Sequence, residues 1–209
     1  MTTTLDRPAA VRKARLLNRL TIGWNVVEGV VAVIAGLAAG SISLVGFGLD
    51  SGIEVSAALV LAWRLSREDH DACTAEDDRL AQRLVALSFA ALAAYVGFQA
   101  IADLASGHRA EASLIGIAIA ALSLVTMPWL ARAKRRLAPL LGSRAASAEA
   151  DQTLLCASLS AAVLVGLGAN AAFGWWWADP VAGLVIAGGS ALMAYRTWTA
   201  DSLEDTCCA

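Results

Sequence analysis

Charge is scarce in this chain: only 16% of its 209 residues are Asp, Glu, Lys or Arg, whereas 58% are hydrophobic. Its mean hydropathy of +0.62 is far from the balance of a soluble domain, which excludes a water-soluble globular protein. The few charged residues are collected into short stretches, and long apolar runs separate them. This distribution indicates an integral membrane protein.

Several other features are sparse or missing. The chain has four cysteines, of which Cys73, Cys207 and Cys208 fall on the side predicted below to be cytoplasmic, so no disulfide framework is expected. No secretory signal peptide, low-complexity tract, soluble-type repeat or second domain is found. No nucleophile and base can be paired in a water-excluding pocket, so we expect no enzyme and no cofactor. The net charge of −2 is small, and nucleic acid is not an expected partner.

Six apolar runs are each long enough to cross about 30 Å of hydrocarbon as a helix. The sequence therefore predicts an all-α integral membrane protein built as a six-transmembrane-helix bundle. We expect a cytoplasmic N-terminal segment (1–16), a transmembrane transport domain (17–200) and a short cytoplasmic tail (201–209). The runs lie near 17–39, 42–65, 81–105, 114–133, 153–173 and 176–198.

The basic residues predict the orientation. If the chain crosses six times, fifteen of its sixteen Lys and Arg residues fall on one side and only Arg109 falls on the other. Under the positive-inside rule both termini are then cytoplasmic, in a multi-pass protein of the cytoplasmic (inner) membrane. The acidic stretch 66–79 and the basic stretch 131–150 are expected to be cytoplasmic connectors, and Trp175–Trp177 to mark the outer boundary.

Two carboxylates interrupt the second apolar run. Asp50 and Glu54 are four residues apart, so both project from one face of a single helix. A carboxylate near the bilayer centre costs roughly 2.5–3.5 kcal/mol on insertion scales, and a like charge one turn away adds to that cost. No basic residue is expected at the same depth. A bound cation is therefore the natural compensation.

The fifth run repeats this spacing, with Gln152 at its cytoplasmic start and Cys156 four residues later. Two helices that each present a pair of ligand-type side chains one turn apart can form a four-coordinate cation site between them. The sequence thus predicts a metal site made of Asp50, Glu54, Gln152 and Cys156.

Other polar residues in the spans are candidates for accessory or proton-path roles. Asn25 and Glu28 in the first run either support such a site or form interhelical hydrogen bonds. Asp103 and Asp179 fall near the outer surface, where a solvated acid, a helix cap or an exit-path ligand are all consistent with the sequence. Asp179 before Pro180 resembles an N-cap followed by proline at the first helical position.

Three segments resemble the cation diffusion facilitator family: Gly40–Glu54 (GSISLVGFGLDSGIE), Ala148–Cys156 (AEADQTLLC) and Gly174–Pro180 (GWWWADP). The family comprises six-helix, usually dimeric transporters that export divalent transition metals in exchange for protons. The resemblance implies that Asp50 and Glu54 are the ligand pair of the second helix, with Glu54 in place of the usual aspartate. It also implies a partner pair of ligands on the fifth helix, where the family usually has His and Asp.

Counting back from the Trp-Ala-Asp-Pro turn assigns that second pair to Gln152 and Cys156. A slip of one or two residues would assign it to Leu154 with Ser158, or to Leu154 with Asp151, and leucine cannot bind a metal. Gln152 offers a neutral carbonyl oxygen and Cys156 a thiolate once a metal displaces its proton. The family's usual cytoplasmic C-terminal domain is not found in this sequence, so a short form is expected.

The resulting hypothesis is a proton-coupled efflux transporter for Zn²⁺, Co²⁺ or Cd²⁺, with the lipid bilayer as its surroundings and a homodimer as its expected state. Mixed oxygen and thiolate ligands favour these ions over Mg²⁺ or Ca²⁺. The alternatives are a non-transporting metal-binding regulator or assembly subunit, and a passive channel. His70, Asp71 and Cys73, and the tail residues Cys207 and Cys208, either bind metal or belong to solvated segments.

Overall fold

The computed structural model describes residues 7–67, 75–141 and 144–199. It describes their side chains except at 7–11, 57, 60–67, 75–82, 85, 138–141, 144–149 and 151–152. Within these ranges the chain is helical apart from short connections, in agreement with the predicted all-α class. The helices are α1 (Arg7–Ala39), α2 (Ile42–Arg67), α3 (Ala75–Ser106), α4 (Leu114–Leu141), α5 (Arg144–Phe173) and α6 (Ala178–Thr199).

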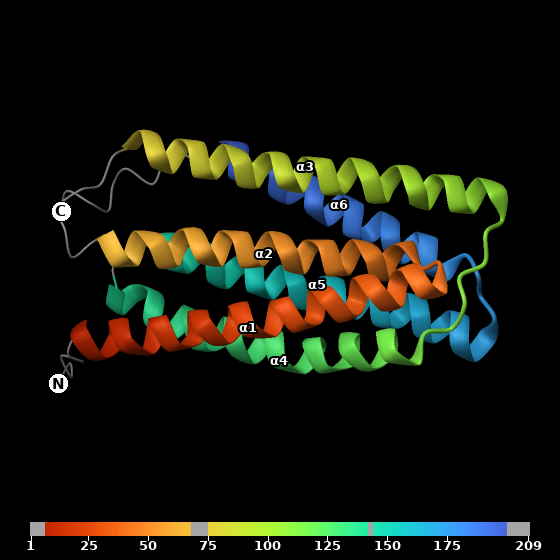
Figure 1. The fold of residues 1–209 in the computed structure, drawn as a ribbon, viewed down its shortest axis with the longest axis horizontal. Helices are drawn as coiled ribbons and strands as arrows, with labels where there is room; N and C mark the ends of the chain where they lie inside the picture. The colour runs from red at the N-terminus through yellow and green to blue at the C-terminus, as the bar shows by residue number, and fades with distance from the viewer. Residues whose placement is uncertain (1–6, 68–74, 142–143, 200–209) are drawn as a thin grey trace.

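The helices run side by side along the long axis of the molecule and alternate in direction (Figure 1). Helices α1, α3 and α5 begin at the end where α2, α4 and α6 finish. We call this the basic end, since exposed cations such as Arg12, Arg132 and Arg136 lie there. The other end carries Trp175 and Trp177, and we call it the tryptophan end.

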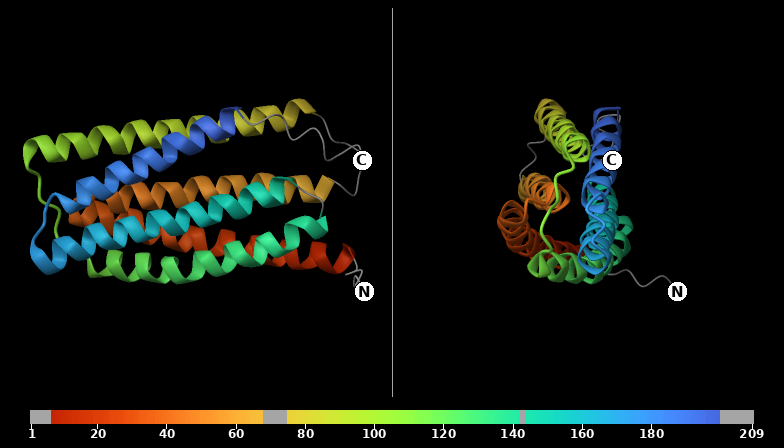
Figure 2. Two further views of the ribbon diagram at one scale, coloured as in Figure 1. Left: turned by 180° about the vertical axis from the view of Figure 1, so that it is seen from behind. Right: turned by 90° about the vertical axis from the view of Figure 1, so that its right-hand side faces the viewer.

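The α2 helix occupies the middle of the bundle. The most extensive contacts join α1 to α2, α3 to α6 and α4 to α5, and α2 also packs against α3, α5 and α6. The view down the long axis shows α3 and α6 as a layer displaced from the group formed by α1, α2, α4 and α5 (Figure 2). Polar side chains on α2 therefore face neighbours on several helices.

Five of the described helices are long and apolar enough to cross a membrane: α1, α3, α4, α5 and α6. The remaining one, α2, carries Asp50 and Glu54. Because α1 ends at the tryptophan end and α3 begins at the basic end, the helix that joins them has to cross as well. The chain is thus a multi-pass membrane protein.

At the basic end the helices are longer than the apolar runs. The stretch 131–150, predicted to be a connector, is instead mostly helical, because α4 continues to Leu141 and α5 already begins at Arg144. Likewise α1 begins at Arg7, ten residues before its apolar run. Hydrophobicity marks where a helix meets lipid, but a helix continues into water wherever its backbone hydrogen bonds and packing persist.

The connections at the tryptophan end depend on glycine. Gly40, after α1, and Gly174, after α5, have φ angles of 65° and 66°. An L-residue with a side chain is disfavoured in this left-handed region, whereas glycine adopts it freely and commonly ends helices. Ser41 and Gly174 then donate backbone hydrogen bonds to Gly36 and Asn170, at 2.9 and 3.0 Å. These tight turns fix the positions at which α2 and α6 begin.

Candidate functional site

One face of α1 is polar and completely buried. Asn18, Thr21, Asn25 and Glu28 are each between 0 and 4% exposed, and their spacing of three or four residues places them on a single side of the helix. Closer to the tryptophan end, the same face continues with the apolar residue Ala32. The polar stripe therefore extends from the basic end to the middle of the bundle and stops at Glu28.

Glu28 lies at the centre of a hydrogen-bond network that joins three helices. Its Oε1 accepts a hydrogen bond of 2.8 Å from the Ser51 hydroxyl of α2. Its Oε2 accepts one of 2.6 Å from the Ser123 hydroxyl of α4 and another from the indole N–H of Trp24. Donors on every side reduce the cost of a buried carboxylate. The sequence suggested an accessory role for Glu28, and the structure gives it the most hydrogen-bond partners among the described carboxylates.

The predicted pair on α2 is also buried, at 6% exposure for Asp50 and 1% for Glu54. The Thr153 hydroxyl of α5 donates to Glu54 Oε1 at 2.8 Å. The second oxygen, Oε2, is buried without a hydrogen-bond partner in the described part of the chain. Asp50 lies within electrostatic range of both Glu54 and Glu28. Three acids on two helices thus share one region.

Cys156 brings α5 to the same region. It is 1% exposed, and its sulfur lies 4.0 Å from Glu28 Oε1. The thiol is also in polar contact with Glu54 and within electrostatic range of Asp50. The structure therefore brings Cys156 together with the α2 pair, as the helix-five pairing required. Metal binding by these residues stays a prediction.

The structure also distinguishes between the possible registers of α5. Leu154 is 37% exposed, and Ser158 is exposed and donates to the Leu154 carbonyl, at 3.3 Å, rather than to the acids. The alternative that pairs Leu154 with Ser158 is therefore wrong, because both face away from the site. The Asp151 and Gln152 side chains lie outside the described set, so their ligand roles stay predictions.

A buried lysine corrects another expectation. We expected no basic residue at the depth of the acids, but Lys134 of α4 is 6% exposed and its Nζ donates to Thr153 Oγ1 at 3.1 Å. That hydroxyl is the one that bonds to Glu54. The sequence put Lys134 in a connector because three arginines surround it, and only the continuation of α4 turns it inward.

The hydroxyl groups of Ser51, Ser123 and Thr153 were not identified from the sequence. Serine and threonine in a helix commonly donate to the carbonyl four residues earlier, as Ser160 does to Cys156 at 2.8 Å. A hydroxyl that reaches another helix has no distinct sequence signal. Asn25, by contrast, was identified from the sequence, yet both polar atoms of its buried side chain lack a hydrogen-bond partner among the described residues.

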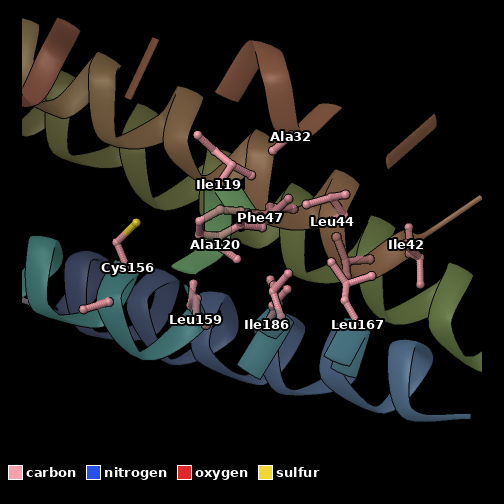
Figure 3. Close-up of a cluster of buried hydrophobic side chains, with 14 of the residues drawn as sticks. Ala32, Ile42, Leu44, Phe47, Ile119, Ala120, Cys156, Leu159, Leu167 and Ile186 are labelled. Carbon is pink, nitrogen blue, oxygen red and sulfur yellow. The ribbon is translucent and has the colours of Figure 1, made fainter. Parts of the chain in front are cut away.

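Towards the tryptophan end the site is bounded by packed apolar side chains. Phe47, Leu44 and Leu167 are all 0% exposed. Figure 3 shows Cys156 at one end of this cluster, with Phe47, Leu44, Leu167 and Ile186 extending away from it. The packing next to the acids on the tryptophan-end side is therefore apolar.

Asp179 is neither a solvated acid nor the residue before α6, and an accessory role for it stays a prediction. It is 1% exposed and therefore not a solvated acid, and α6 already begins at Ala178. Its Oδ1 accepts hydrogen bonds from Ser41 and Ser43, of 2.6 and 2.5 Å, which join the first turns of α2 and α6. Asp103 is half-buried nearby, within electrostatic range of Asp179.

The described side chains contain no cluster of three or more His, Cys, Asp and Glu groups arranged to hold a metal ion. The acids and Cys156 are neighbours, and the hydroxyls of Ser51, Ser123 and Thr153 contact two of the acids. The other candidate ligands, His70, Asp71, Cys73, Cys207 and Cys208, lie outside the described residues.

Residues 20–199 match the family model of the cation efflux transmembrane domain. The match takes in most of α1 and all of α2 to α6, and so every described residue that surrounds the buried acids. No curated protein matches the chain at a significant level.

Proposed function

Because the chain belongs to the cation efflux family, also called the cation diffusion facilitators, we propose that it is a proton-coupled exporter of divalent transition metals across the cytoplasmic membrane. The observation that carries this proposal is the meeting of Asp50, Glu54 and Cys156 between α2 and α5, halfway along the bundle. Family membership supports cation efflux. The choice of metal, the coupling to protons and the ligand set belong to the proposal.

The donor chemistry supports Zn²⁺, Co²⁺ or Cd²⁺ as cargo. Asp50 and Glu54 supply anionic oxygens and Cys156 supplies a sulfur that becomes a thiolate when a metal displaces its proton. A thiolate favours borderline and soft ions, whereas Mg²⁺ and Ca²⁺ prefer shells made only of oxygen. In our proposal Gln152, and Asp151 as an accessory group, complete the site from α5, with Glu28 and Asn25 lining the approach.

Coupling to protons follows from the use of one set of atoms by two kinds of cation. A carboxylate oxygen that binds a metal cannot hold a proton, so the metal and protons exclude each other at Asp50 and Glu54. The hydroxyls that contact Glu28 and Glu54 can donate or accept, so the network can adjust to either occupant. Binding of metal from one side and of protons from the other then gives antiport.

Access to the site differs between the two ends. The buried polar stripe of α1 approaches the acids from the basic end, which the positive-inside rule assigns to the cytoplasm. On the other side, Phe47, Leu44 and Leu167 pack without exposure. In our proposal this conformation receives metal from the cytoplasm, and export requires these apolar contacts to separate. We also propose that two copies of the protein form a homodimer in the membrane.

The test is zinc flux into proteoliposomes. Purified protein is reconstituted with an inside-acidic pH gradient, and Zn²⁺, Co²⁺, Cd²⁺ and Mn²⁺ uptake is followed with an indicator inside the vesicles. We expect uptake of the first three that stops when an ionophore collapses the gradient. Glu54→Gln should abolish it, and Glu111→Gln, in the exposed connection before α4, should not. Uptake independent of the pH gradient would contradict the antiport proposal.

A second candidate function, a non-transporting metal-binding regulator or assembly subunit, is favoured by one observation. The described residues hold no assembled cluster of three ligands, and the family's usual His and Asp on the fifth helix are replaced here. Binding of Zn²⁺ at equilibrium without any flux would support this function over transport.

A further inference from the structure

Lys134 differs from the other cations of its segment. Arg132, Arg135 and Arg136 are exposed, whereas Lys134 is 6% exposed. A lysine near a helix end usually extends its ammonium group into water. The last residue of α4, Leu141, is about two turns away, and the arginines on both sides of Lys134 are exposed. Burial of this charge therefore requires compensation from inside the bundle.

One contact that offsets the charge is made through a hydroxyl group of α5. Lys134 Nζ donates to Thr153 Oγ1 at 3.1 Å, and Thr153 donates its own proton to Glu54 Oε1 at 2.8 Å. An ammonium group has only donors and a carboxylate only acceptors, so the hydroxyl between them is oriented in one direction. The positive charge thus stands one hydroxyl group away from the acid of the proposed site.

This arrangement leaves part of Glu54 available. Its Oε2 is buried and has no hydrogen-bond partner in the ranges that the structure describes. A direct salt bridge to Lys134 would occupy the carboxylate, whereas the contact through Thr153 offsets its charge and leaves one oxygen unoccupied. An unpaired buried oxygen is costly by itself, and it is the kind of atom that a divalent cation binds.

We propose that Lys134 is a tethered counter-cation: its ammonium group balances the acids while the site is empty and withdraws towards the basic end when a divalent cation binds. The inference rests on the proposed function, since it takes Glu54 to be a ligand of the cargo. It makes Lys134 a positioning residue that sets the affinity of the site. Every ion that binds has to replace the lysine, which prevents the site from holding metal too tightly to release it.

The identity of the residue fits this role. A lysine carries a compact charge on a flexible stem with rotatable donors, so it can leave Thr153 without rearranging the helix. The planar group of an arginine forms several directed hydrogen bonds at once and is less suited to leaving. Lys134 is also one of only two lysines in the chain, the other being the exposed Lys13.

The two lysines allow a direct test in the unmodified protein. The protein in nanodiscs is treated briefly with an amine-acylating ester, with and without Zn²⁺, and labelling at each lysine is measured by mass spectrometry. Displacement into water should raise the labelling rate of Lys134 by about threefold or more, while Lys13 serves as the internal reference and does not change. Labelling of Lys134 that is unchanged or lowered by Zn²⁺ would overturn the proposal.

A pair of variants tests the effect on affinity. Lys134→Met removes the charge and keeps a similar side-chain length, so Zn²⁺ should bind about 10-fold more tightly or better, since no like charge opposes it. Lys134→Arg retains the charge and should keep the weaker binding, and Lys13→Met is the matched control on the same side of the bundle. A Lys134→Met protein that folds, yet binds Zn²⁺ no more tightly, would show a structural role only and refute the inference.

The outcomes separate this inference from the transport proposal. If the wild-type protein carries no Zn²⁺ into proteoliposomes but Zn²⁺ still raises labelling of Lys134, transport fails and the counter-cation stands. If Zn²⁺ is transported and neither labelling nor affinity responds at Lys134, only the counter-cation is refuted.

Discussion

At the scale of single residues, the buried acids are balanced by hydroxyl groups of other helices. Ser51 and Ser123 bond to Glu28, and Thr153 bonds to Glu54. A carboxylate in an apolar run is easy to find in a sequence, because few side chains are so costly there. The hydroxyls that bond to such a carboxylate are hard to identify from the sequence. Serine and threonine also bond within their own helix, as Ser56 does to the Gly52 carbonyl at 3.0 Å.

Replacement of Cys156 by serine tests whether the thiol is a ligand. Cys156→Ser keeps the size of the side chain and removes the soft donor, so Cd²⁺ affinity should fall by about 10-fold or more while Mn²⁺ affinity changes little. The measurement is a competition titration with a metal indicator in detergent. Ser158→Ala, on the exposed side of α5, is the control. Equal losses for both metals would argue for Asp151 as the α5 ligand instead.

Truncation of Glu28 tests the hydrogen-bond network. Glu28→Ala removes the acceptor of the Ser123 and Trp24 donors and leaves Ser51 only its bond of 3.1 Å to the Phe47 carbonyl, so the protein should be destabilised by about 2 kcal/mol or more. Thermal unfolding in detergent measures this, with Glu111→Ala at an exposed site as the control. Glu28→Gln should recover part of the loss, because its carbonyl oxygen still accepts. A Glu28→Ala protein as stable as the wild type would mean that the network contributes nothing.

At the scale of helices, α1 and α2 approach each other through glycine. A Cβ atom added at Gly48 would lie 2.9 Å from the Gly29 carbonyl oxygen and 2.7 Å from a Val33 methyl group. Small residues permit such contact between backbones, and close contact is the main source of helix association in lipid. This packing holds Glu28 of α1 within hydrogen-bond distance of Ser51 of α2. Glycines in the spans indicated close packing, but not which pair of helices they join.

Two glycines of α2 offer a matched test of this contact. Gly48→Ala should separate α1 from α2 and destabilise the protein by about 1–3 kcal/mol, because backbone atoms cannot move aside cheaply. Gly52→Ala, one turn away, meets nothing within 4 Å and should be neutral or slightly stabilising. Thermal unfolding of both variants gives the comparison. If the two behave alike, helix propensity rather than interhelical contact explains the result.

At the scale of the whole molecule, the two ends of the bundle differ in chemistry. Exposed cations lie at one end, and stacked aromatic rings lie at the other, where the centroids of Trp175 and Trp177 are 5.3 Å apart. Positive charge is retained in the cytoplasm, so the cations predict which end is cytoplasmic. Indole rings settle at either membrane interface, so Trp175 and Trp177 predict only that the opposite end lies at such an interface. The buried polar stripe of α1 extends from the acids towards the basic end.

Labelling of single cysteines tests this orientation. In a variant without its native cysteines, Arg109→Cys should react with a membrane-impermeant maleimide added to intact cells. Arg136→Cys should react only after the cells are permeabilised, since it lies at the basic end. Mass shift or fluorescence on a gel is the readout. Labelling of the second variant in intact cells would contradict the assignment of the basic end to the cytoplasm.

The sequence by itself determined that the protein is a helical membrane protein, the order of its helices, and that two acids lie within α2. Long apolar runs, an uneven distribution of cations and a carboxylate in an apolar run can each be accommodated in few ways. Tertiary structure decided which face of α5 turns inward, the central position of Glu28, and the burial of Lys134. These depend on the rotation of each helix about its axis and on how far it continues beyond the lipid. Contacts with the other helices set both the rotation and the length, and these contacts cannot be read from the sequence of one helix alone.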